Sequence, residues 1–155
     1  MNPNSPIYVV VLLAHAGSAL VGFGSVALAG FYAPRLANGE DEGRRFFGSK
    51  RIVSRSMVFA TVLFGVSLLF LSAKPAVFLR YPWLRLGILL YLAAIFTVIF
   101  FIWPIERRLS EAIRVLEPND FHSIKNLCVS LGRRCALVDV LVAVTLLLMV
   151  TQPGR

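Results

Sequence analysis

Two ionisable side chains lie inside apolar stretches of this sequence, and both have types that could do chemistry. His15 interrupts the run LLAHAGSALVGFGSVALAG (residues 12–30), and Asp139 lies five residues after Arg134, inside another apolar run. Ionisable groups within a membrane-spanning segment are costly and are often functional. A neutral imidazole can ligate a haem iron, accept a proton or bond to a neighbouring helix. The sequence therefore leaves His15 either a functional or a structural role.

Asp139 needs a partner if it lies below the membrane surface. A carboxylate in an apolar environment is either paired with a cation or protonated. Arg55 opens another apolar segment at a similar depth, so we predict an intramembrane ion pair between Asp139 and Arg55. A proton or cation site at Asp139 is the alternative. We expect His15 and Asp139 near opposite membrane surfaces, which argues against a catalytic pair.

The other candidate ligand residues are few. By helical rise, the second histidine, His122, is expected about 20 Å or more from His15, too far for both to ligate one haem. Cys128 and Cys135 are two helical turns apart, too far for a disulfide between them, and we expect both to be packing residues. With His122 they form no recognisable metal-ligand set. No phosphate-binding glycine loop, carboxylate pair or serine–histidine–acid pattern indicates an enzyme.

Four apolar segments must position these side chains. The chain has 155 residues, of which 57% are hydrophobic and only 15% are charged, whereas about a quarter are charged in soluble domains. A helix of about 20 apolar residues crosses the hydrocarbon core of a bilayer. Segments of suitable length lie at about residues 7–32, 56–73, 84–104 and 135–151. We therefore predict an all-α, polytopic membrane protein, a four-transmembrane-helix bundle that forms a single domain over residues 1–155.

The basic residues predict how this bundle is oriented. The net charge is +8, and most of the cations fall in the connections at residues 33–55 and 105–134. They are Arg35, Arg44, Arg45, Lys50, Arg51, Arg55, Arg107, Arg108, Arg114, Lys125, Arg133 and Arg134. Cytoplasmic loops collect lysine and arginine, so we predict that both connections are cytoplasmic and both termini outside, in the bacterial cytoplasmic (inner) membrane. The expected partners are the lipid bilayer and anionic headgroups at the cytoplasmic face, and not nucleic acid.

Small residues form a stripe on the first apolar segment. Helical spacing places five of them along one face: Ala14, Ser18, Gly22, Ser25 and Ala29. Small side chains let membrane helices approach closely. We predict that this face packs within the bundle, and packing against a second copy or a partner subunit is the alternative. The first residues, MNPNSP, contain no lysine or arginine, so we expect this segment to stay in the mature chain.

Prolines and periodicity predict the inner ends of the helices. Pro34 and Pro104 follow the first and third segments, and we expect these helices to bend or stop there. Apolar residues then recur at helical spacing between Leu109 and Leu116, which predicts an amphipathic helix near the headgroups that continues the third segment. A break at residues 117–120 precedes a helix that runs unbroken into the fourth segment.

Several short motifs suggest a relationship. They are His15 in the first segment, FYAPRL (31–36), RRFFGSKR (44–51), TVLFG (61–65), WLRL (83–86), and Arg134 with Asp139 at the fourth segment. In these motifs the chain resembles bacterial four-helix membrane proteins of the HemJ-type protoporphyrinogen oxidase and CopD-type copper-resistance group. The resemblance implies a four-helix fold. It also implies that, if the protein binds a cofactor, the cofactor is haem b or a porphyrin. It makes His15, Arg35 and Arg85 candidate cofactor-binding residues.

The chain also departs from that group. The HemJ pattern resembles FYLPRL followed closely by a further histidine, where this chain has Ala37, Asn38 and Gly39. It favours lysine at the position of Arg85. These departures make the leading prediction a small inner-membrane protein without a cofactor, which acts as a structural or accessory component of a membrane assembly or homo-oligomer. A haem- or porphyrin-binding oxidoreductase using His15 and a proton- or ion-coupled transporter using Asp139 are the alternatives.

Overall fold

The computed structural model describes residues 5–49, 52–71, 80–115 and 124–151, and the regular structure in them is helical. The elements are α1 (Pro6–Ala37), α2 (Asp41–Gly48), α3 (Ile52–Leu71), α5 (Pro82–Thr97), the π-helical segment η1 (Val98–Ile102), α6 (Trp103–Val115) and α7 (Lys125–Thr151). Four helical stretches are long and apolar enough to cross a membrane: α1, α3, the continuous run of α5, η1 and α6, and α7. The all-helical fold with four candidate spans is confirmed. The predicted break at 117–120, with His122, lies outside the described residues.

The ends of α1 follow from local sequence. The Ser5 hydroxyl accepts a hydrogen bond from the Tyr8 amide at 3.3 Å, and Pro6 stands in the first turn, where a missing N–H is harmless. After α1 the chain turns at Gly39, whose φ of 78° is readily adopted only without a side chain. This turn lets the Gly39 amide donate to the Leu36 carbonyl and brings α2 back against α1.

Of the two expectations for the inner prolines, a bend or a stop, the stop is wrong, because neither proline ends its helix. Pro34 lies within α1, which continues to Ala37, and Pro104 lies in the first turn of α6. The π-helical segment η1 comes directly before α6 and widens the backbone by one residue per turn. Because a proline ring clashes with the carbonyl four residues earlier, this widening accommodates Pro104 without ending the helix. The third span therefore continues into the amphipathic α6, as its periodicity predicts.

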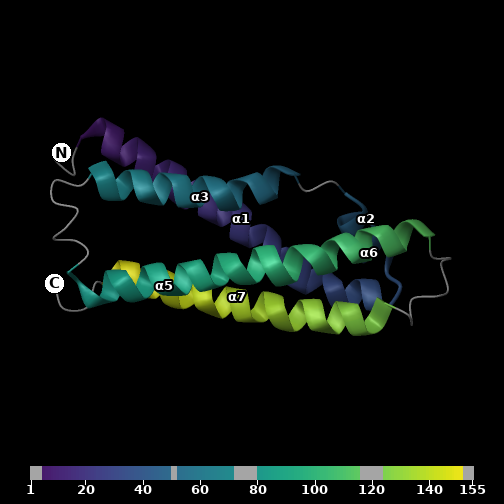
Figure 1. Cartoon of the computed structure of the whole chain (residues 1–155). Helices are drawn as coiled ribbons and strands as arrows, with labels where there is room; N and C mark the ends of the chain where they lie inside the picture. The colour runs from purple at the N-terminus through teal and green to yellow at the C-terminus, as the bar shows by residue number, and fades with distance from the viewer. Residues whose placement is uncertain (1–4, 50–51, 72–79, 116–123, 152–155) are drawn as a thin grey trace.

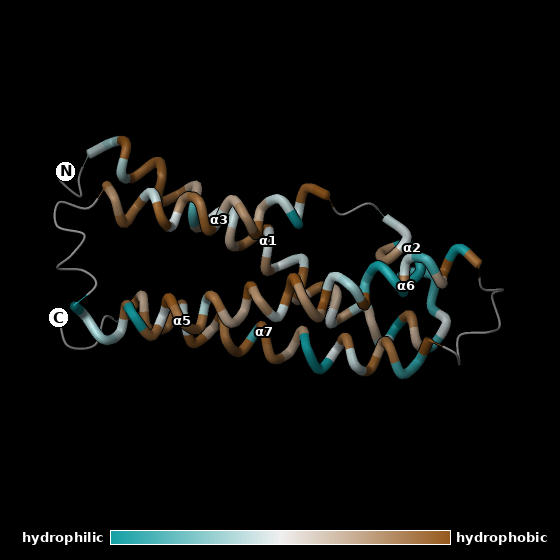
Figure 2. Tube along the Cα trace, viewed as in Figure 1, coloured by the Kyte–Doolittle hydropathy of each residue, from teal (hydrophilic) through white to brown (hydrophobic). Residues whose placement is uncertain are grey.

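The four long helices alternate in direction, and α1 is central. It crosses from beside α3 to beside α7, and α5 packs against α7 (Figure 1). Helix α2 packs against α1 and α6 at the end where α1 finishes. Hydrophilic residues concentrate at that end, over α2, α6 and the first turns of α7, whereas the rest of the long helices is mostly apolar (Figure 2). Most of the charged residues thus lie at this end of the bundle, which we call the charged end.

Glycines of α1 set its close contacts with both neighbours. A Cβ atom on Gly22 would lie 2.9 Å from the Val58 backbone nitrogen of α3. A Cβ atom on Gly30 would lie 2.8 Å from the Cys135 Cβ of α7. Such backbone approach increases the van der Waals contact that holds helices together in lipid. The central position of α1 therefore depends on residues without side chains.

We predict that Gly22→Leu destabilises the protein and that Gly17→Leu does not. Leucine at position 22 must push α3 away from α1, at a cost of about 1–3 kcal/mol. No atom lies within 4 Å of a Cβ on Gly17, which faces outward from the same helix. Thermal unfolding of the full chain in mild detergent, followed by circular dichroism, measures both variants. Equal transition temperatures for the two variants would contradict this packing.

Candidate functional site

A polar cluster lies among apolar residues where α1, α3 and α5 come together. Its members are His15 and Ser18 of α1, Thr61 of α3 and Tyr91 of α5. His15 Nδ1 lies 2.9 Å from the Thr61 carbonyl oxygen, and the Ser18 hydroxyl donates to the His15 carbonyl at 2.9 Å. Ser18 and Thr61 are buried. The bond between His15 and Thr61 joins α1 to α3 within the apolar part of the bundle.

The bond to Thr61 determines which ring nitrogen of His15 carries the proton. A carbonyl oxygen can only accept, so Nδ1 of His15 must carry the proton in this bond. In the neutral ring, Nε2 then has the free lone pair. Gly65 makes room for the ring, because a Cβ atom there would lie 3.0 Å from His15 Cε1. His15 is therefore held by α3 through one nitrogen and presents the other as an acceptor or ligand.

Tyr91 adds a second unused polar group. Its hydroxyl is buried and faces the Thr61 side chain, but it has no hydrogen bond of good geometry with the described residues. Its ring packs edge-on against Phe23 of α1, with centroids 5.6 Å apart. The Thr61 hydroxyl donates to the Met57 carbonyl of its own helix. Sequence reasoning missed Tyr91, although a tyrosine in the middle of an apolar span was a signal for it.

The structure does not bring Arg35 to His15. Twenty residues of α1 separate them, which corresponds to about 30 Å of helical rise. Arg35 instead pairs with Glu40 and Glu42 at the charged end, and its guanidinium lies 4.5 Å from the centre of the Phe31 ring. Arg85 is exposed in the first turn of α5. One planar cofactor cannot contact both His15 and Arg35.

Arg55 is paired with a residue other than the predicted one. Its Nη2 donates to Oε2 of Glu106 at 3.3 Å, and its guanidinium lies 5.6 Å from the centre of the Trp103 ring. The Glu106 side chain is only 7% exposed. This ion pair joins the start of α3 to α6, whereas the predicted partner, Asp139, belongs to α7, on the other side of α1 (Figure 1).

Asp139 lies on an exposed face of α7. Ala136 and Ala143, one turn away on either side, are exposed as well. Gly132 lies on the same stripe, and no atom lies within 4 Å of a Cβ placed there. No ion pair or hydrogen bond joins Asp139 to any described residue. The face of α7 around this carboxylate therefore consists of small residues, and no other helix among the described residues packs against it.

The stripe of small residues on α1 lies against the neighbouring helices over most of its length. Ser18, Gly22 and Ala29 are buried, and Ala14 and Ser25 are partly buried. The Ser25 hydroxyl donates to the carbonyl of Gly22 in its own helix. The contacts of this stripe are to α3 and α7 within the chain.

The cysteines and the remaining candidate ligands form no centre in the described part of the chain. Cys128 and Cys135 are buried residues of α7, and neither is in a disulfide bond. No group of three histidine, cysteine or acidic side chains in residues 5–49, 52–71, 80–115 and 124–151 could hold a metal ion.

Comparisons with known proteins give no relative. No protein-family model matches the chain, and no curated protein or solved structure is significantly similar to it. The resemblance to the HemJ and CopD group therefore stays a prediction, and the function has to be argued from the residues.

Proposed function

We propose that this protein is a multi-pass protein of the bacterial cytoplasmic membrane and acts as a non-catalytic component of a membrane assembly. In this orientation the charged end, with α2 and α6, faces the cytoplasm. The support is the concentration of arginine at that end, together with Trp103 beside Arg55 at the level where aromatic side chains favour the interface. The start of α1 and the end of α7 then face outward.

The observation that carries the assembly proposal is the exposed carboxylate of Asp139. Asp139 lies five residues beyond Arg134 along α7, or about 7–8 Å deeper into the membrane. An acidic side chain facing lipid costs about 2.5–3.5 kcal/mol at the centre of a span and less near its ends. Asp139 has no partner among the described residues, so a donor from another chain would remove this cost.

The surroundings of Asp139 suit a helix as that partner. Gly132, Ala136, Asp139 and Ala143 follow one another at steps of four, three and four residues, which keeps them on one stripe of α7. Small residues on such a stripe allow close approach of another helix, and a polar side chain can then bond across the contact. The docking face of α7 is defined by these four residues.

The charge of Asp139 favours a different protein over a second copy. Two copies related by a two-fold axis would place their α7 stripes against each other at the same depth. The two carboxylates would then lie close together, and like charges disfavour one another. A spanning helix with an arginine, lysine or hydroxyl side chain opposite Asp139 is the complementary partner.

We predict that a photo-crosslinking amino acid at Ala143 captures this partner in cells. Leu89, an exposed residue of α5, is the control position and should give no protein adduct. The adduct at 143 should fall at least fivefold in Asp139→Leu and persist in Asp139→Asn, which keeps a polar group. Mass spectrometry should identify a membrane protein with a basic or hydroxyl side chain in the crosslinked span.

Three outcomes would overturn the proposal. They are lipid adducts alone at both positions, an adduct at 143 that does not depend on Asp139, and a dimer of this chain as the sole product. Transport through Asp139, the alternative from sequence, would need the carboxylate inside the bundle. Its exposed position on α7 does not favour that function.

A second function has a specific observation in its favour, namely haem or porphyrin binding through His15. Histidines that ligate metals usually donate their other ring N–H to a carbonyl or carboxylate, and His15 has this arrangement with Thr61. The Tyr91 hydroxyl, which also faces Thr61, has no hydrogen-bond partner among the described residues and could bond to a ligand. Against it, Arg35 lies too far from His15 to contact the same ligand.

For this second function we predict a Soret band in protein purified from cells supplied with haem, and its loss in His15→Gln. Glutamine can still donate to the Thr61 carbonyl, so the variant should fold, which its thermal transition checks. A spectrum without a Soret band in the unaltered protein, or the same band in His15→Gln, would exclude His15 as the haem ligand.

A further inference from the structure

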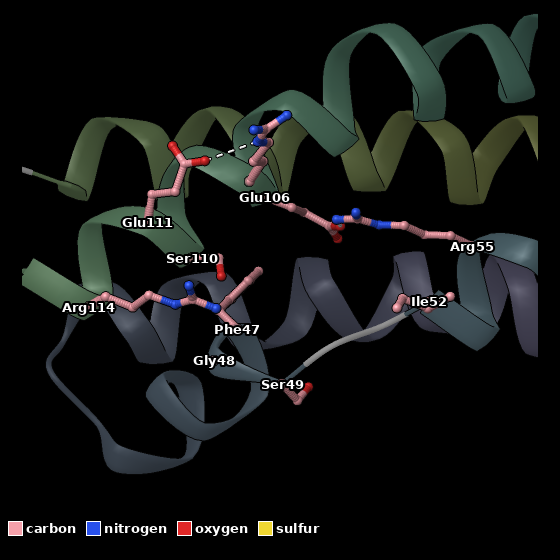
Figure 3. Close-up of a pocket in the computed structure, with 10 residues that line it drawn as sticks. Phe47, Gly48, Ser49, Ile52, Arg55, Glu106, Ser110, Glu111 and Arg114 are labelled. Carbon is pink, nitrogen blue, oxygen red and sulfur yellow. Dashed lines mark hydrogen bonds and ion pairs between the residues drawn. The ribbon is translucent and has the colours of Figure 1, made fainter.

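A cavity of about 220 Å³ opens at the charged end of the bundle. Its walls are the end of α2, the start of α3 and one face of α6 (Figure 3). This volume is far above the roughly 10–15 Å³ that a single water molecule needs. Neither the polar cluster around His15 nor the docking face of α7 includes any of its lining residues.

Cations outnumber anions in this cavity. Its lining contains three arginines, Arg55, Arg107 and Arg114, and two carboxylates, Glu106 and Glu111. Arg55 pairs with Glu106, and Arg107 pairs with Glu111 at 3.0 Å on the exposed side of α6. Arg114 has no ion pair with a described residue, and Figure 3 shows it extending from α6 toward Phe47 of α2. The cavity therefore has one positive charge in excess.

The cavity also has a donor that the protein does not use in an ion pair. This donor is the guanidinium of Arg114, which is exposed on α6 and has no ion pair with a described residue. A ligand with acceptor oxygens would pair with it. Ser110 contributes a hydroxyl one helical turn before Arg114. Guanidinium groups with a hydroxyl form the donor set that recognises phosphate oxygens.

The position of the cavity distinguishes a lipid from a free ion. It lies where the apolar α3 begins, and Ile52 of its lining is an exposed apolar residue. Phe59 and Leu63 continue the same face of α3 toward the other end of the bundle, and both are exposed. A ligand with a phosphate and acyl chains would match the donors and the apolar face together, whereas inorganic phosphate would match the donors alone.

We propose that this cavity binds the phosphate of an anionic phospholipid, with the acyl chains along the exposed face of α3 that contains Ile52, Phe59 and Leu63. The site needs the helices to lie in a membrane but does not depend on a partner at α7. General attraction to an anionic surface is worth about 1 kcal/mol per basic residue wherever that residue lies. A built site instead depends on particular arginines.

The test compares Arg114→Gln with Arg108→Gln in the full chain. Arg108 is an exposed arginine of the same helix that does not line the cavity, so both variants lose one charge from α6. Native mass spectrometry in neutral detergent measures the binding of phosphatidylglycerol and, as separate arms, of phosphatidylcholine and inorganic phosphate. We expect phosphatidylglycerol binding to fall about tenfold in Arg114→Gln, as for the loss of one charge-assisted hydrogen bond, and less than twofold in Arg108→Gln.

Each other outcome overturns the proposal. Equal losses in the two variants would mean general electrostatic attraction without a site. Inorganic phosphate binding as tightly as phosphatidylglycerol would mean a free anion, and equal binding of phosphatidylcholine would remove the role of the negative charge. Arg55 is left unaltered because it pairs with the buried carboxylate of Glu106, and breaking a buried ion pair destabilises the fold.

Discussion

The structure depends on one constraint, which is that a polar group inside a hydrocarbon layer has no water to bond to. Helices satisfy their own backbones, and three threonine hydroxyls of the described spans bond within their own helices as well. Thr61, Thr97 and Thr145 each donate to the carbonyl four residues earlier in their own helix. His15 differs, because its ring donates to a carbonyl of another helix. That bond therefore connects α1 to α3, whereas the threonine hydroxyls bond only within their own helices.

The same constraint explains why the charged end is built differently. There α2 and α6 supply partners for the arginines, as in the pairing of Arg55 with Glu106. Arg134 donates to the Phe101 carbonyl in the π-helical segment at 3.3 Å, close to the turn that Pro104 alters. Irregular backbone and charge thus occur together at this end. Asp139, the Tyr91 hydroxyl and the Nε–H of Arg55 are exceptions, since each lacks a hydrogen-bond partner among the described residues. For the exposed Asp139, a helix of another chain would supply one.

The sequence predicts the elements well because apolar length and helical periodicity are local properties. The four spans, the amphipathic continuation into α6 and the unbroken α7 all follow from runs of residue types. The pairing of Arg55 could not be predicted in the same way. It depends on which helices are neighbours, and α1 lies between α3 and α7. Glu106 could be recognised in the sequence as the carboxylate close to Trp103 and Pro104. The periodicity of a sequence, however, does not predict which helices are neighbours in a bundle.

The most direct test of the four-span arrangement is to determine on which side of the membrane the charged end lies. Single cysteines at Ser49, after α2, and at Arg80, before α5, are exposed positions at opposite ends of the bundle, and the native cysteines are buried. A membrane-impermeant maleimide should label Arg80→Cys in intact cells and Ser49→Cys only after the cytoplasmic membrane is permeabilised. Labelling of Ser49→Cys in intact cells, or labelling of both positions from the same side, would contradict the four-span arrangement with an inner charged end.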